Sequence, residues 1–192
     1  MKAELNIVMS LEELTSVICR RRTSMLVDKE REVPRNLVTQ LCALAQWAPN
    51  HKRTWPWQFA LVDGDGRARL GQVISAAMAV NGDPAEKVAK TLTKYLRTPA
   101  SLVVGSAAGD SPLRTAENRD ATAAGIQNLL LGATAAGLGT YWSSCPKGAN
   151  DEVAALCGFE NGTWISAIVY LGWATSLVEC PQRPPVDLHL VH

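Results

Sequence analysis

This sequence has almost no net charge, few histidines and no closely paired cysteines. Its 192 residues include 19 Lys and Arg against 18 Asp and Glu, so the formal net charge is +1. Nucleic acids and anionic membrane surfaces select proteins with a clear excess of basic residues, and we therefore expect neither as a partner. The 3 histidines are too few and too scattered for a metal triad, so we expect no bound metal.

Cysteine is present in an odd number, and no two cysteines form a Cys-x-x-Cys pair. This pattern argues against a disulfide framework and against a zinc site. The first ten residues contain Lys2 and Glu4 and lack the apolar core of a signal peptide, so we expect a cytoplasmic protein with reduced thiols. Cys145 could be a nucleophile, but neither a histidine nor an acidic residue lies near it in the sequence, and an inert thiol is the favoured interpretation.

A membrane helix is one interpretation of the uncharged stretch 121–146. The stretch is rich in alanine and glycine rather than leucine and phenylalanine, and it contains Gln127 and Asn128. Small residues mark close helix packing in a soluble core as readily as in lipid. We therefore expect a buried helix.

Two glycine-containing motifs suggest ligands that their context does not support. Gly137-Leu138-Gly139 closes a predicted helix and precedes a predicted strand, which is the reverse of the strand-turn-helix order of a Rossmann site. The segment 63–66, Asp-Gly-Asp-Gly, lacks the spacing and the terminal Glu of a calcium loop, and we predict a turn there.

Hydrophobic periodicity predicts helices mixed with strands. Ser10 and Glu13 have the spacing of a capping box, at the start of a helix that ends in Arg20-Arg21-Arg22. Pro34 suits the first turn of a second helix that runs to Ala48. Further helices are predicted at 67–80, 84–97, 116–136 and 150–157, and strands at 58–62, 101–107, 140–143 and 164–171.

No linker divides the sequence, so we expect one domain over 1–192 with an extended C-terminal arm at 175–192. The arm contains three prolines and then Asp187-Leu188-His189-Leu190-Val191, which alternates like an edge strand. An arm of this kind could pair with a neighbouring subunit.

The loop after the second predicted helix combines imidazole, basic and indole side chains, and it suits a planar, anionic aromatic ligand. Its residues are His51, Lys52, Arg53, Trp55 and Trp57. Core packing is the favoured interpretation for Trp57, whereas Trp55 is equally consistent with a core or a ligand contact. The three arginines at 20–22 could be a solvated helix end, but the cationic loop and Arg183 make a phosphate site the more attractive interpretation.

Five motifs in the same order resemble the nitroreductase superfamily of FMN-dependent oxidoreductases, in particular its short, single-domain bacterial branch. The family's Arg-Arg-Ser is matched here by Arg21–Thr23, and its Ala-Pro loop with the following Gln-Pro-Trp is matched by Ala48–His51 and Trp55–Trp57. Its central helix with a Gly-x-Gly-x-x-Trp exit is matched by Gln127–Leu131 and Gly137–Trp142, its Tyr-Leu-Gly by Tyr170–Gly172, and its Arg-Pro-Pro by Arg183–Pro185. The resemblance implies an α+β fold with a mixed, mostly antiparallel sheet flanked by helices. It also implies a homodimer that exchanges C-terminal arms and holds two FMN molecules at its interface.

The resemblance further assigns roles to individual residues. Arg21, Arg22 and Thr23 are expected to hold the FMN phosphate and ribityl chain or the pyrimidine edge, with Arg183 closing on the phosphate. Trp47 and His51 are expected to approach from the other subunit. The isoalloxazine ring is expected to lie against Trp142, Ser143 and Ser144, with a backbone N–H near the reactive nitrogen.

The implied activity is a ping-pong transfer of a hydride from NAD(P)H through FMN to a nitroaromatic, a quinone or a similar acceptor. No catalytic side chain is expected, because the flavin carries the chemistry. Two positions depart from the family pattern: Met25 replaces a frequent Lys or Arg, and Trp55, placed in the acceptor pocket, replaces Gln. A non-catalytic FMN-sequestering protein and a dedicated flavin-dependent dehydrogenase or dehalogenase remain alternatives, and the acceptor and the choice between NADH and NADPH stay open.

Overall fold

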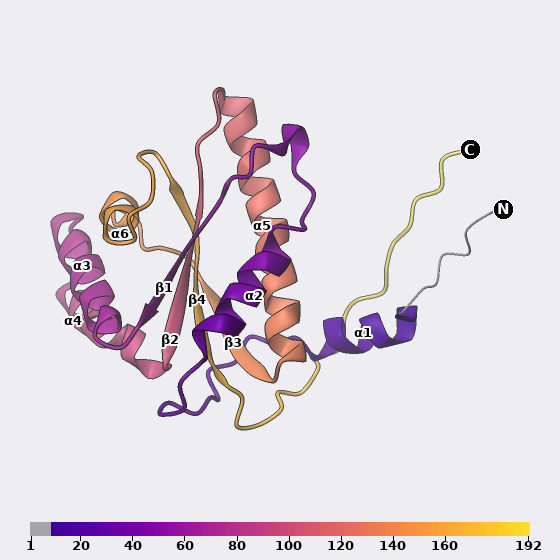
Figure 1. Ribbon diagram of the computed structural model, residues 1–192, viewed down its shortest axis with the longest axis horizontal. Coiled ribbons are helices and arrows are strands. Elements are labelled where there is room, and N and C mark those ends of the chain that lie inside the picture. The colour runs from indigo at the N-terminus through magenta and orange to yellow at the C-terminus, as the bar shows by residue number, and fades with distance from the viewer. Residues whose placement is uncertain (1–8) are drawn as a thin grey trace.

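A computed structural model describes residues 9–192 and places a four-stranded sheet at the centre of the chain (Figure 1). The strands are β1 (Trp57–Asp63), β2 (Ala100–Ser106), β3 (Leu138–Ser143) and β4 (Trp164–Trp173). Their order is β1-β2-β4-β3, and every pair of neighbours is antiparallel. The expectation of a mixed sheet is therefore wrong, because all strands of the sheet are antiparallel. In the described residues, a parallel pairing occurs only as an isolated bridge between Thr23 and Thr140.

Helices cover both faces of this sheet (Figure 1). On one face lie α2 (Arg35–Ala45) and α5 (Pro112–Ala135), and on the other lie α3 (Gly66–Val80), α4 (Ala85–Leu92) and α6 (Asn150–Leu156). Side chains alternate between the faces of a strand, so Leu102 and Val104 of β2 join the core under α2 and α5, while Val103 joins the core under α3. A strand buried on both faces accounts for the continuous apolar run of β2.

The uncharged stretch forms most of α5, and its glycines allow the close packing that we predicted. A Cβ on Gly125 would lie 2.6 Å from the indole nitrogen of Trp57, and one on Gly132 would lie 2.5 Å from a side-chain carbon of Leu44. The prediction of a buried helix is confirmed. Among residues 9–192, no helix combines the length and the apolar character needed to cross a membrane.

Several predicted boundaries move, for local reasons. The helix α5 begins earlier than expected, because the hydroxyl of Ser111 caps its first turn and Pro112 needs no hydrogen-bonded N–H there. The predicted helix at 84–97 divides at Thr93 into α4 and a short 3₁₀-helix, η2 (Lys94–Arg97). The helix α2 ends at Ala45 rather than Ala48.

The helix α1 (Leu11–Arg20) and the C-terminal tail lie on the same side of the molecule, away from the sheet (Figure 1). The capping box is confirmed, since the Ser10 N–H donates to the Glu13 carboxylate at 2.7 Å and the Glu13 N–H donates to the Ser10 hydroxyl at 3.1 Å. The edge strand predicted at 187–191 does not form in the single chain. A strand needs a neighbour for its backbone hydrogen bonds, and the described tail has none.

Candidate functional site

Two adjacent arginines, Arg21 and Arg22, and a distant one, Arg183 of the tail, line one cavity. Arg21 follows α1 directly, and the backbone N–H of Ser24 donates to the Thr140 carbonyl at 2.8 Å, which fixes the segment beside β3. The tail returns Arg183 to this segment. A cavity of about 390 Å³ is lined by Arg21, Arg22, Thr23, Val178, Glu179, Pro181 and Arg183. The structure thus brings together all four residues that the resemblance assigned to the phosphate end of FMN.

The electrostatics of this cavity favour an anion. Partial burial, and then the charges of Arg22 and Arg183, lower the pKa of Arg21. Among the ion pairs of the described residues, none joins these three guanidinium groups to a carboxylate. A phosphate would relieve the repulsion between them and would accept paired N–H bonds from a guanidinium. The residues present therefore fit a phosphate-bearing cofactor.

The end of β3 supplies the second group of predicted residues. The bridge from Thr23 to Thr140 places this strand next to the arginine cavity. Trp142 is 38% exposed and its indole N–H donates to the Ser166 carbonyl at 3.2 Å, which fixes the plane of the ring. Ser143 is buried, whereas Ser144 is exposed. An exposed, fixed indole followed by accessible backbone is suited to lining a planar ligand.

The loop between α2 and β1 presents two exposed indoles and an imidazole. Trp47 is 84% exposed and Trp55 is 62% exposed, and His51 begins a short 3₁₀-helix, η1 (His51–Arg53). Lys52, Arg53 and Trp55 all have positive φ angles, of 62°, 52° and 51°. Residues with a Cβ pay for this left-handed conformation, and strain of this kind concentrates at functional sites.

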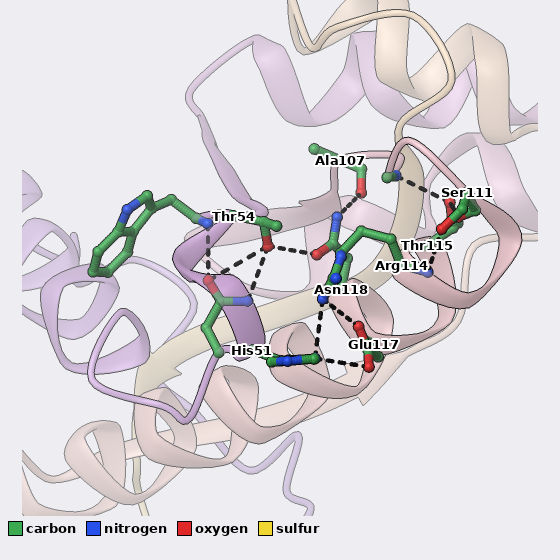
Figure 2. Close-up of polar contacts among 11 residues, drawn as sticks. His51, Thr54, Ala107, Ser111, Arg114, Thr115, Glu117 and Asn118 are labelled. Carbon is green, nitrogen blue, oxygen red and sulfur yellow. Dashed lines mark hydrogen bonds and ion pairs between the residues drawn. The ribbon is translucent and has the colours of Figure 1, made fainter.

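Ionic and amide groups hold this loop against the start of α5 (Figure 2). The Nδ1 atom of His51 lies 2.9 Å from a Glu117 carboxylate oxygen and 3.0 Å from a guanidinium nitrogen of Arg114, and Arg114 also pairs with Glu117. The hydrogen bond from His51, more than the charges of Arg114 and Lys52, lowers the pKa of Glu117. Both contacts engage Nδ1, and no hydrogen bond among residues 9–192 engages Nε2, which leaves that nitrogen available to a ligand.

Sequence reasoning missed this support. Arg114 and Glu117 have the i, i+3 spacing of an ion pair on a helix, which was the available signal. Asn118 gave no signal at all, yet its buried amide accepts a hydrogen bond from the Thr54 hydroxyl at 2.6 Å and donates one to the Ala107 carbonyl at 3.1 Å.

One chain does not bring the loop and the arginine cavity together. His51 contacts the first turns of α5, whereas Thr140 follows the end of that helix. At about 1.5 Å per residue, the helix separates them by roughly 30 Å, and Figure 1 shows the two ends of α5 far apart. Trp47, His51 and Trp55 therefore lie outside the arginine cavity of their own chain.

Three further residues can now be placed. Trp57 is buried and its indole N–H donates to the Ala121 carbonyl at 3.2 Å, so the core interpretation is confirmed. Burial, more than the nearby Cys157 and Glu152, raises the pKa of Cys145 to about 12. A thiol with that pKa is almost entirely protonated at neutral pH, which supports an inert Cys145. Met25 packs against the core under α3.

Comparison with known proteins gives consistent results. Residues 18–173 match a family model described as "Nitroreductase family". In Bacillus subtilis (strain 168), the protein named "Putative NAD(P)H nitroreductase YfhC" is 29% identical over 173 residues, which are 88% of this chain and 89% of that protein. These matches confirm the resemblance inferred from the motifs.

Solved structures agree. The crystal structure of a nitroreductase-like family protein from Bacillus cereus has a TM-score of 0.77 at 29% identity, covering 92% of this chain and 94% of that chain. The FMN-dependent nitroreductase NfnB from Mycobacterium smegmatis, in complex with NADPH, has a TM-score of 0.70 at 20% identity, covering 89% and 94%. This second likeness concerns the fold.

Proposed function

Because the chain belongs to the nitroreductase family, we propose that it is an FMN-dependent oxidoreductase. It transfers a hydride from NAD(P)H through the flavin to an oxidised acceptor such as a nitroaromatic or a quinone, in a ping-pong sequence. The observation that carries the proposal is the cavity that gathers Arg21, Arg22 and Arg183 beside β3 without a matching set of carboxylates. The M. smegmatis relative, which is FMN-dependent and was solved with NADPH, supports the choice of cofactors.

The arginine cavity would hold the phosphate of FMN. Guanidinium groups bind phosphate through paired N–H bonds, and the Thr23 hydroxyl adds a donor near the ribityl chain. Trp142, Ser143 and Ser144 would line the isoalloxazine ring, with a backbone N–H near its reactive nitrogen. Bound FMN would supply the hydride chemistry, so the task of these residues is to bind, to orient and to exclude water.

A homodimer would complete the site. Trp47, His51 and Trp55 are exposed, and none of them lines the arginine cavity of their own chain. We therefore assign them to the flavin of a partner subunit, with Trp55 narrowing the acceptor pocket. The tail also exposes apolar side chains that a partner subunit could bury: Leu177, Val186, Leu188, Leu190 and Val191. A partner subunit that takes up the part of the arm beyond Arg183 would bury most of these side chains and would give the alternating segment a strand to pair with, while residues 178–183 stay in the cavity of their own chain.

The absorption spectrum of the purified protein tests the cofactor. We expect the peaks of bound flavin, and we expect them to disappear in the double variant Arg21→Ala with Arg22→Ala. Arg20→Ala is the matched control, because this neighbouring guanidinium faces the Ser16 carbonyl and does not line the cavity. Loss of flavin from the control as well, or colourless wild-type protein, would contradict the assignment.

Turnover is a separate measurement. The yellow protein should oxidise NAD(P)H when a quinone or a nitroaromatic is added, and a dimer should be seen by light scattering. The second candidate, an FMN-sequestering protein, is favoured by one observation: Met25, where the family often has a cation, is an apolar side chain that packs against the core. Flavin that stays oxidised in the presence of NADH and NADPH would favour that candidate.

A further inference from the structure

A second cationic groove lies outside the residues assigned to FMN. It has a volume of about 450 Å³ and is formed by α4, by η2 and by the loop that follows β3. Its charged lining consists of Lys87, Lys90, Lys94 and Arg97, and no carboxylate lines it in the described part of the chain. Four positive charges facing one hollow make an anion site.

Two of the four cations have no counter-charge. Lys87 pairs with Asp83 and Lys90 with Glu86, each at 2.6 Å along α4. Lys94 and Arg97, in contrast, belong to none of the ion pairs found among residues 9–192.

Aromatic rings lie beside both free cations. Lys94 is half-buried, with its ammonium 5.7 Å from the centre of the Tyr95 ring, whereas Arg97 is exposed, with its guanidinium 6.0 Å from the centre of the Tyr170 ring. The Arg97 Nε–H also donates to the Lys94 carbonyl at 3.1 Å. Burial, followed by the charges of Arg97 and Lys87, lowers the pKa of Lys94. A bound anion would remove this repulsion, and preorganised cations lose little entropy when they bind one.

The position of the groove relates it to the proposed hydride donor. Pro146 lines it, and Pro146 stands two residues after Ser144, which we assign to the flavin ring. FMN carries a single phosphate, for which the cavity of Arg21, Arg22 and Arg183 is already available. A second anion site that shares the chain segment following Ser144 suits the other phosphate-bearing molecule of the reaction. NADPH differs from NADH in carrying a phosphate monoester on its adenosine ribose.

We propose that the groove of Lys87, Lys90, Lys94 and Arg97 binds this ribose phosphate and gives the protein a preference for NADPH over NADH. The inference rests on the proposed function for the identity of its ligand. The hydroxyl of Thr93, which also lines the groove, offers an additional donor to the phosphate.

Binding measured on the purified protein tests the groove independently of turnover. Fluorescence titration with NADPH and with NADH should give a clearly lower Kd for NADPH. Lys94→Gln should raise the Kd for NADPH about fivefold, the usual effect of one partly solvated ionic contact, and leave the Kd for NADH unchanged. Lys90→Gln, an exposed position on α4, should act in the same direction without risk to folding. Lys29→Gln, outside the groove, is the control of equal charge change.

Three results would overturn the proposal. Equal affinity for the two nucleotides would do so, as would an unchanged preference in both Lys94→Gln and Lys90→Gln. Loss of flavin absorbance from Lys94→Gln would assign the groove to FMN instead. Failure of the proposed function is a different outcome. A colourless protein that prefers NADPH, and that loses this preference with Lys94→Gln, would support the groove as a nucleotide site but would contradict the proposal that the protein is a flavoenzyme.

Discussion

Replacing Asn118 with alanine should release the loop that presents His51 and Trp55. The Asn118 amide connects this loop to α5 and to the end of β2, through the Thr54 hydroxyl and the Ala107 carbonyl. Asn50 completes the anchor by accepting the Trp55 N–H at 2.9 Å. Together these bonds oppose the cost of three left-handed residues, which is about 1 kcal/mol or more for each.

The magnitude follows from the bonds that are lost. Asn118 is 2% exposed and both of its hydrogen bonds are part-buried, so water replaces them only in part when the amide is removed. Two hydrogen bonds at about 1 kcal/mol each, with part of the penalty for an unpaired carbonyl, give a loss of about 3 kcal/mol in the free energy of unfolding. For a chain of this size, that loss corresponds to a fall in Tm of about 6–12 °C.

Asn128→Ala is the matched control on the same helix. Its amide makes one exposed bond, to the Leu44 carbonyl at 3.3 Å, and the substitution should cost less than about 1 kcal/mol. Urea denaturation measures both losses. Hydrogen exchange followed by mass spectrometry should show faster exchange of the peptide containing Trp55 in Asn118→Ala alone. Equal stability of the two variants, or unchanged exchange at Trp55, would refute the anchoring role.

Three further predictions concern packing, thiols and pH. Gly71→Ala should lower the free energy of unfolding by about 2–3 kcal/mol, because the new Cβ would lie 2.3 Å from a carbonyl oxygen of α4. Gly66→Ala is the control and should lower it little, since its nearest contact would be at 3.4 Å. Thermal denaturation of the two variants compares these losses. Alkylation at pH 8 followed by mass spectrometry should modify Cys19 and Cys180, which are exposed, well before the other thiols, whose pKa values burial raises to about 11 or 12. The lowered pKa of Glu117 means that its contribution to stability is complete above the ordinary carboxyl value of about 4.3 and is lost as the pH falls through the lower folded value. Glu117→Gln should therefore flatten the stability curve below about pH 4.5, and an unchanged acid limb would contradict this.

Most elements of this chain could be predicted because their signals are local. The capping box at Ser10, the apolar run of β2 and the small residues of α5 each appear within a few neighbouring positions, and all three predictions are confirmed. The family could be predicted because its motifs keep their order along the chain, and the match over 18–173 confirms it. The cytoplasmic location, the FMN contacts and the homodimer stay predictions.

Other features depend on residues that only folding brings into contact. Nothing near Asn118 in the sequence indicates that it anchors a loop more than sixty positions earlier, because the hydrogen bond to Thr54 exists only when α5 packs beside that loop. The edge strand predicted in the tail is absent from the single chain for the same kind of reason: alternation supplies a suitable face, but a strand forms only against a neighbour.

The arginines at 21–22 and the cationic loop were recognisable from residue chemistry alone, since charge and aromatic character belong to single side chains. Whether they meet is a matter of distance, which local patterns do not contain. The tertiary structure brings Arg21 and Arg22 together with Arg183. It separates this arginine cavity from His51 by most of the length of α5. The groove of Lys87, Lys90, Lys94 and Arg97 is a mixed case. Their spacing already places the four charges on one face of a predicted helix, but only packing beside Met78 and Pro146 turns that face into a hollow.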